Sequence, residues 1–200
     1  MQNNANSPSS RGPSSPLNRT KITVPDLQRI PVLYPHGTRI IWITQNGEIT
    51  VRDRQTIVAD LALGPPLVCH RRWSEARSGV EITSCLDLME LFAFARPARF
   101  CLPTPAGLAA QLSLPRPHSA EDMAAILPKA AFMLLDELAL LEGRAHEEAA
   151  GIAGMMGAGG WMWGPLILAH LGLSAARPAP PDGMQAAIWR RLPEFTDYTP

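Results

Sequence analysis

The sequence predicts an α/β fold, in which helices flank a mixed sheet and a helical extension follows. Short runs rich in β-branched and aromatic residues alternate with helical patterns in the first half of the chain, and helical patterns dominate the second half. Of the 200 residues, 46% are hydrophobic, which is enough for one domain with a buried core. Strand and helix patterns that alternate in this way are typical of the class.

The strand patterns lie between residues 38 and 91. Thr38–Thr44 (TRIIWIT) precedes an Asn-Gly pair, the strongest short hairpin signal, so we expect Glu48–Arg52 to return as its partner strand. Leu67–Cys69 predicts a short buried strand. Ile82–Leu91 predicts a longer apolar strand that passes into a helical turn near residues 92–94.

Helix signals occur between and after these runs. Thr104 is a good N-cap before a proline, and Ser119 with Asp122 forms a capping-box pattern. Pro128 lies inside the apolar stripe that follows Ser119, so we expect it to kink or split that helix. The helices expected from caps and apolar spacing are residues 54–63, 70–78, 104–112, 119–141 and 166–171.

Composition divides the chain into four segments. The first is rich in Ser, Pro and Asn and is expected to be disordered, and the last is Pro/Ala-rich and predicts a linker. Within the last segment, Met184–Leu192 around Trp189 is a candidate amphipathic stretch. The expected segments are a tail at 1–28, an α/β domain at 29–143, a helical extension at 144–173 and a linker at 174–200.

Charge and hydropathy exclude several broad classes. The formal net charge is zero, so there is no bulk electrostatic signal for nucleic acid or a membrane. The N-terminus is polar, which excludes an ordinary signal peptide. The sequence contains no uncharged apolar run of about 18 residues, so we expect no transmembrane helix. We therefore expect a cytoplasmic protein without a membrane partner.

The motifs of common catalytic sites are missing from the sequence. Cys69, Cys85 and Cys101 lack zinc-ligand spacing and are expected to be buried reduced thiols. Cys69 and His70 are neighbours, which point apart on a strand, so they give little support for a nucleophilic pair. The glycine-rich run at 157–160 (GAGG) lacks the Lys-Ser/Thr of a phosphate-binding loop and is expected to join two helices.

Two pairs of residues are the candidate metal ligands, although we expect no metal site. Asp87 and Glu90 would share a face only if they lie on a helix, and such a pair is more often solvated than functional. His118 and Asp122 are one helical turn apart and could share a metal or a proton, but helix capping explains Asp122 without chemistry.

Four arginines are the candidate nucleic-acid contacts. Arg71 and Arg72 precede Trp73, and Arg96 lies near Arg99. Arginine beside an aromatic residue can bind a single strand by charge and stacking. The alternative is an ordinary solvated surface, which the neutral overall charge favours. The tryptophans at 161, 163 and 189 are most simply packing anchors of the C-terminal helices.

With these residues in view, the chain resembles the N-terminal region of alphaproteobacterial DinG-type ATP-dependent DNA helicases. Its most distinctive part is Ser84–Leu114, and the resemblance covers roughly residues 35–195. The segments that carry it are Leu67–His70 (LVCH), Leu86–Leu112 (LDLMELFAFARPARFCLPTPAGLAAQL), Gly160–Gly172 (GWMWGPLILAHLG) and Trp189–Phe195 (WRRLPEF).

The resemblance implies a ribonuclease-H-like sheet, because some relatives begin with a DEDD-type 3′–5′ exonuclease domain. Such exonucleases hold two metals with Asp-x-Glu on the first strand, a later Asp and a His-plus-Asp pair, because two cations must clamp the attacking and leaving oxygens. This chain departs at each place. The strand Arg39–Thr44 has no acid, and Glu75 is the only acid near the position after His70 where the pattern expects one. His118 and Asp122 are four residues apart, whereas the pattern separates its His and Asp by five. Asp87 would match an acid that has a structural role in the strand, not a metal ligand.

The chain also lacks the helicase motor. It has no Walker A motif, no Asp-Glu box and no cysteine set for an iron–sulfur cluster. ATP and Mg²⁺ therefore belong to the motor of full-length relatives, and we expect no cofactor here. The chain is expected to be either the product of a truncated helicase gene or a stand-alone domain.

Three functions follow from these expectations. The first is a non-catalytic accessory domain of a DNA-repair helicase that helps to place single-stranded DNA or a partner, with the motor as a partner in cis. The second is an active metal-dependent 3′–5′ exonuclease. The third is a protein-interaction domain that uses the Trp-Met-Trp segment at 161–163.

Overall fold

The computed structural model describes residues 27–173. The predicted tail and linker, including the amphipathic stretch at 184–192, lie outside these residues. Only the last two residues of the expected tail, 27 and 28, are described, and they lie in a short 3-10 helix, η1 (Leu27–Arg29).

The sheet is mixed and has five strands in the order β3-β2-β1-β4-β5. Its first three strands form an antiparallel meander, and β4 and β5 run parallel to β1. The predicted mixed α/β fold is therefore confirmed. The strands are β1 (Val32–His36), β2 (Arg39–Ile43), β3 (Ile49–Arg52), β4 (Leu67–Val68) and β5 (Leu86–Asp87).

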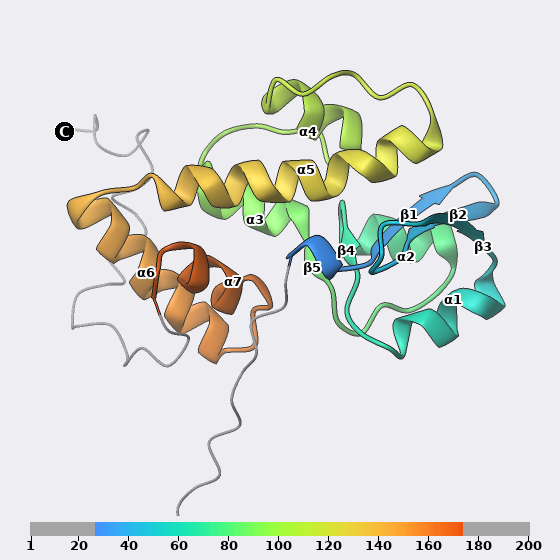
Figure 1. Cartoon of the computed structure of the whole chain (residues 1–200), viewed down its shortest axis with the longest axis horizontal. Coiled ribbons are helices and arrows are strands. Elements are labelled where there is room, and N and C mark those ends of the chain that lie inside the picture. The colour runs from blue at the N-terminus through green and yellow to red at the C-terminus, as the bar shows by residue number, and fades with distance from the viewer. Residues whose placement is uncertain (1–26, 174–200) are drawn as a thin grey trace, which may run out of the picture.

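Among the described residues, α5 is the long helix that runs through the middle of the molecule (Figure 1). The sheet with α1 and α2 lies at one end, and α6 and α7 lie at the other. The helices are α1 (Arg54–Leu61), α2 (Arg71–Ser78), α3 (Leu88–Ala95), α4 (Pro105–Gln111), α5 (Ala120–Ala139), α6 (Gly143–Ala158) and α7 (Trp163–His170).

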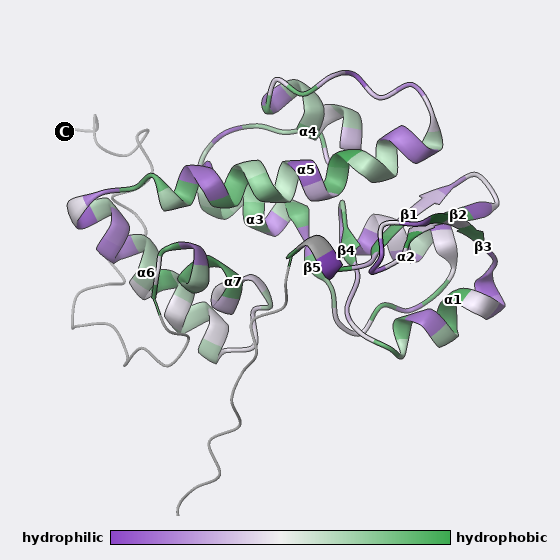
Figure 2. Ribbon diagram, in the orientation of Figure 1, coloured by the Kyte–Doolittle hydropathy of each residue, from purple (hydrophilic) through white to green (hydrophobic). Residues whose placement is uncertain are grey.

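Both faces of the sheet are buried at β1, and alternate residues of this strand divide between them. Val32 and Tyr34 face the larger core, which α3, α5, α6 and α7 complete. Leu33 faces a smaller core that includes Trp42 of β2 and Ile57 of α1. Hydrophobic residues run along most of α5, which supplies much of the larger core (Figure 2). This alternation is the period of two expected for a strand buried on both faces.

The predicted hairpin and most helix caps are confirmed. β2 pairs with β3 across the Asn-Gly turn, where Gly47 has a φ of +82° that suits glycine. Thr104 caps α4, and Ser119 with Asp122 forms the capping box of α5. α2 begins after His70 and ends at Gly79, as predicted.

The central strand β1 was not predicted, because Pro31 and Pro35 make its sequence look like a loop. Pro35 sits opposite Ile40 of β2, whereas the parallel pairing with β4 includes only Val32. After Val32, β1 therefore has no paired residue on the side of β4. The missing N–H of Pro35 on that side removes no hydrogen bond between strands.

The long strand predicted at Ile82–Leu91 is wrong. Only Leu86 and Asp87 pair with β4, and α3 begins at the next residue. The Asp87 side chain accepts a hydrogen bond from Met89 N–H, which makes it an N-cap, and the apolar residues that follow bury one side of a helix. A continuous apolar run fits a buried strand or a buried helix equally well.

α5 continues through Pro128, so the alternative in which this proline splits the helix in two is wrong. Helices α6 and α7 pack in the same core as α3 and α5, with Trp163 fully buried among them. The predicted helical extension thus shares the main hydrophobic core with the sheet.

Candidate functional site

A polar pocket lies where the parallel strands β4 and β5 end. It has a volume of about 730 Å³ and opens between the N-terminal ends of α2 and α3. Ligands of open α/β sheets commonly bind outside the carboxyl ends of parallel strands. The lining residues are His70, Arg71, Arg72, Glu75, Asp87, Met89, Glu90 and Ala93.

Asp87 ties the two helices together at the base of this pocket. One carboxylate oxygen, Oδ2, accepts a hydrogen bond from Arg71 N–H at 2.8 Å, and Oδ1 accepts one from Met89 N–H at 2.9 Å. The residue is 6% exposed. Its negative charge lies at two helix N-termini, where the helix dipoles favour an anion. Asp87 therefore has a structural role, with both oxygens engaged.

The other two carboxylates of the pocket are also held by the fold. Glu75 Oε1 accepts hydrogen bonds from Ile82 N–H at 3.0 Å and from Arg71 Nε at 3.2 Å. The Ile82 bond is the main reason why the pKa of Glu75 lies below its usual value. Glu90 Oε2 accepts from Trp161 Nε1 at 2.8 Å. Each acid thus has a hydrogen-bond partner inside the protein.

The two pocket arginines come from the first turn of α2. Arg71 pairs with Glu75, although its side chain is 44% exposed, and Arg72 is exposed. The structure therefore brings the predicted contacts Arg71 and Arg72 into the same pocket as the candidate ligands Asp87 and Glu90. Sequence reasoning placed these two sets in separate groups.

A pair of stacked aromatic rings joins β1 to α2, and sequence reasoning missed it. Tyr34 of β1 stacks on Trp73 of α2, with ring centroids 5.8 Å apart. The Arg77 guanidinium lies 5.8 Å from the centre of the Trp73 ring. Burial raises the pKa of Tyr34 above its usual value. Only the alternation of Val32 and Tyr34 could have indicated this pair, by showing that residues 32–36 form a strand.

Cys69 and His70 do not form a reactive pair. Burial is the main cause of the raised pKa of the Cys69 thiol, which keeps it protonated. His70 instead caps α2, because its Nδ1 accepts a hydrogen bond from Trp73 N–H at 3.2 Å. Cys85 and Cys101 are also buried and free, as predicted, and burial raises the pKa of Cys85 to about 12.

His118 and Asp122 lie at the start of α5 and act in its capping. Asp122 Oδ2 accepts from the backbone N–H groups of His118 and Ser119, both at 3.1 Å, and these bonds lower its pKa. Within residues 27–173, no three or more His, Cys, Asp or Glu side chains form a group that could hold a metal. The four candidate ligands are therefore not assembled into one site.

Arg96 and Arg99 differ in their surroundings. The Arg96 guanidinium makes a two-pronged pair with Glu137 of α5, in which Nε lies 2.9 Å from Oε2 and Nη2 contacts Oε1. Its Nη1 also donates to the carbonyl of Gln111 at 2.7 Å. Arg99 is exposed. Arg96 therefore joins α3, α4 and α5, and of these two arginines Arg99 has the side chain that is more open to a ligand.

The Arg96–Glu137 pair should contribute measurably to stability. A double-mutant cycle with Arg96→Ala and Glu137→Gln is expected to give a coupling energy of about 1 kcal/mol in urea unfolding, because the pair is bidentate but partly exposed. The Arg144–Glu148 pair joins residues four apart on α6 rather than different helices; it is the comparison and should couple by about 0.3–0.5 kcal/mol. Equal couplings would contradict the structural role of Arg96.

The tryptophans of the 161–163 segment are packing anchors, as predicted from the sequence. Trp163 is fully buried, and its Nε1 donates to the carbonyl of Asp87 at 2.7 Å. Trp161 packs on Phe94 with ring centroids 5.2 Å apart. This segment therefore presents no exposed face of paired tryptophans. The preceding glycines end α6 and form the joint to α7, with a φ of +96° at Gly160.

Comparisons with known proteins do not identify the chain. No protein-family model matches it, and neither the curated proteins nor the solved structures include a significant match. Within residues 27–173, no helix is long and apolar enough to cross a membrane.

Proposed function

We propose that this chain is a ribonuclease-H-like accessory domain that binds single-stranded nucleic acid without cleaving it and serves a DinG-type helicase. The order β3-β2-β1-β4-β5, with β2 antiparallel and β4 and β5 parallel to β1, is compatible with the ribonuclease-H-like arrangement. The helicase connection rests on the sequence resemblance alone.

The observation that carries the non-catalytic part is the use of Asp87. In a two-metal nuclease, carboxylates at the ends of the central strands must be free to clamp two cations. Here β1 (VLYPH) has no acid, and Cys69 and His70 follow β4. Asp87 ends β5, but both of its oxygens cap helices. The carboxylates needed for two-metal hydrolysis are therefore missing from these positions.

Nucleic-acid binding is supported by the arginines at the pocket mouth. Arg71 and Arg72 line the pocket from the first turn of α2, and the partly exposed Trp73 follows them in the chain. Proteins that bind single strands combine basic groups with aromatic stacking. Two arginines and three carboxylates line the pocket, and the carboxylates are held by hydrogen bonds. We therefore expect weak binding, with a Kd of roughly 10⁻⁴–10⁻⁶ M at physiological salt.

Fluorescence anisotropy with a labelled single-stranded oligonucleotide tests this proposal. The double variant Arg71→Ala/Arg72→Ala should bind more weakly, and its plot of log K against log salt should be shallower by about 0.7 for each phosphate that the variant no longer neutralises. Arg116→Ala removes an exposed arginine from the α4–α5 loop and is the matched control. Binding that does not depend on salt, or an equal weakening in both variants, would contradict the proposed role of Arg71 and Arg72.

A cleavage assay separates binding from catalysis. With Mn²⁺ or Mg²⁺ and a 3′-labelled strand, we expect the oligonucleotide to remain intact. Metal-dependent shortening that is lost in Asp122→Ala or Glu90→Gln would show an active nuclease instead. Shortening that survives both substitutions would point to a contaminating enzyme.

A further inference from the structure

One edge of the sheet is formed by β3. This strand stands last in the strand order, and within residues 27–173 only β2 pairs with it. Ile49 is 46% exposed and Val51 is 51% exposed, so two β-branched side chains of the edge lie on the surface. Exposed apolar edge strands tend to pair with a further strand unless something prevents it.

The backbone groups that face outward from β3 belong to Ile49 and Val51. Thr44 N–H donates to the carbonyl of Glu48 at 2.9 Å, which shows that the backbone groups of these two residues face each other across the hairpin. Such residues alternate along an antiparallel pair, so the backbone groups of Thr50 also face β2. Those of Ile49 and Val51 therefore point away from β2, and each residue offers one donor and one acceptor to a further strand.

We propose that β3 pairs with β3 of a second copy of this chain, antiparallel and around a twofold axis at Thr50. In this register Ile49 lies opposite Val51 of the second copy, and the two residues exchange two N–H···O bonds. The twofold axis repeats this pair, so the outward groups of both residues are satisfied in both copies. The two sheets would then form one continuous sheet.

The apolar and hydroxyl side chains match themselves in this register. Val51 lies opposite Ile41 of β2, which belongs to the larger core, so Ile49 and Val51 both project on that face. In the dimer, the two Ile49–Val51 pairs would form one apolar stripe across the axis. Thr50 would lie opposite Thr50 of the second copy, and threonine pairs are favourable across strands.

The charges at the ends of the strand match as well. Glu48 would lie opposite Arg52 of the second copy, so an acid would meet a base on each side of the axis. Glu48 is exposed. Arg52 already donates from Nε to Asp60 at 2.7 Å, but its guanidinium has further N–H donors for a second carboxylate. Residues 48–52 (EITVR) therefore form a self-complementary sequence, which favours a second copy as the occupant of this edge.

The neighbouring registers satisfy fewer backbone groups. A shift that places Val51 opposite itself would bring Ile49 opposite Asp53, whose N–H is already used in the capping box of α1. A shift that places Ile49 opposite itself would bring Val51 opposite Gly47, whose N–H already closes the hairpin turn. The register at Thr50 is therefore the one that we expect.

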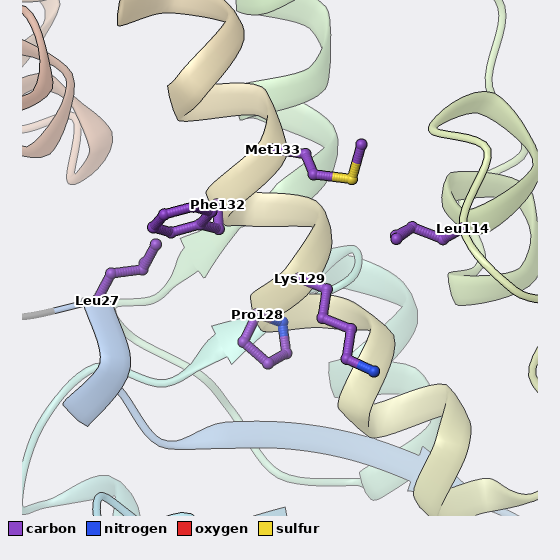
Figure 3. A pocket seen from close by; sticks show the side chains of 6 residues that line it. All are labelled: Leu27, Leu114, Pro128, Lys129, Phe132 and Met133. Carbon is purple, nitrogen blue, oxygen red and sulfur yellow. The ribbon is translucent and has the colours of Figure 1, made fainter.

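The described residues also include an apolar groove on α5, which could join two copies in a different way. It has a volume of about 430 Å³, and its lining includes Leu27, Leu114, Phe132 and Met133. In Figure 3, Phe132 lies beside Leu27, and Met133 extends toward Leu114. This groove offers apolar side chains without a row of backbone groups, so it does not specify its partner. It supplies a control for the experiments on β3.

Cysteine scanning of β3 in the full chain tests the pairing and its register. Facing residues of a pair that is not hydrogen-bonded have Cα atoms about 4.5 Å apart, which a disulfide can span. Under mild oxidation, Thr50→Cys should therefore give disulfide-linked dimers in severalfold higher yield than Ile49→Cys or Val51→Cys. Ala145→Cys, exposed on α6 at the other end of the molecule, measures the background. The three native cysteines are buried.

Sedimentation equilibrium measures the dimer without a cross-link. A pair of short strands is a small interface, so we expect a weak dimer that dissociates on dilution. Glu48→Lys should raise its dissociation constant about tenfold, because two attractive contacts with Arg52 become repulsive. Glu147→Lys makes the same change of charge on the exposed surface of α6 and should have no effect, and neither should Phe132→Lys in the groove.

The proposal is overturned if the chain stays monomeric at every concentration, or if Thr50→Cys links no better than Ala145→Cys. A maximum at Ile49→Cys or Val51→Cys would contradict the register. A dimer that Phe132→Lys weakens and Glu48→Lys does not would belong to the groove on α5. These measurements contain no oligonucleotide, so their result is independent of the proposed function.

Discussion

Replacing Asp87 with alanine should reduce the free energy of unfolding by about 2–4 kcal/mol, because α3 loses its N-cap and the first N–H of α2 loses its side-chain acceptor. Arg71 N–H bonds to the Asp87 carboxylate, whereas Met89 N–H also donates to the carbonyl of Cys69 at 3.2 Å. The destabilisation should therefore be felt most at the start of α2. Urea unfolding, with the midpoint and slope fitted separately, measures the change.

Two matched variants separate this double role from ordinary helix capping. Asp53→Ala removes an exposed N-cap from α1 alone and should cost clearly less. Asp87→Asn keeps one acceptor oxygen and should fall between wild type and Asp87→Ala. If Asp87→Ala and Asp53→Ala have the same effect, Asp87 does not join the two helices.

Replacing Gly164 with alanine should lower stability by about 1–3 kcal/mol, because the added methyl group would overpack the crossing of α6 and α7. A Cβ at this position would lie 2.6 Å from Gly157 Cα and 2.7 Å from the carbonyl oxygen of Ala153, both backbone atoms that cannot move alone. α7 would have to shift, and Trp163 would shift with it. For a chain of this size, each kcal/mol corresponds to a fall in Tm of about 2–4 °C.

The control for this prediction lies in the adjoining helix. A Cβ at Gly154 of α6 meets no atom within 4 Å. Gly154→Ala should therefore stabilise the protein by about 0.5–1 kcal/mol, because alanine loses less backbone entropy in a helix. Destabilisation of similar size by both substitutions would mean that the close crossing at Gly164 does not set the cost. A neutral Gly164→Ala would contradict the close crossing.

Features that depend on a few neighbouring residues could be predicted from the sequence. The Asn-Gly hairpin, the Thr104 cap and the capping box of Ser119 each rest on contacts within four residues or on one backbone conformation. β1 could not be predicted, because a strand tolerates Pro35 only where no neighbouring strand needs its N–H. That depends on β4 pairing with β1 only at Val32, which the local sequence does not show. Residues 88–95 could not be assigned either, because a buried helix and a buried strand share the same apolar composition.

The candidate site depends on contacts between distant parts of the chain. Arg71 and Asp87 are 16 residues apart, and the parallel pairing of β4 with β5 brings them together. Trp161 reaches Glu90 across 71 residues. From the sequence, Arg71 with Arg72 and Asp87 with Glu90 could therefore be recognised only as two separate pairs of charged residues. Their convergence, and the capping role of Asp87, required the sheet order.

Hydrogen–deuterium exchange of the full chain, with and without a single-stranded oligonucleotide, tests most directly whether the pocket between α2 and α3 binds nucleic acid. The proposed function predicts slower exchange in peptides covering residues 70–75 and 87–93 when the oligonucleotide is present, and no such change for Arg71→Ala/Arg72→Ala. Protection confined to other parts of the chain, or no protection at an oligonucleotide concentration that saturates binding, would contradict it.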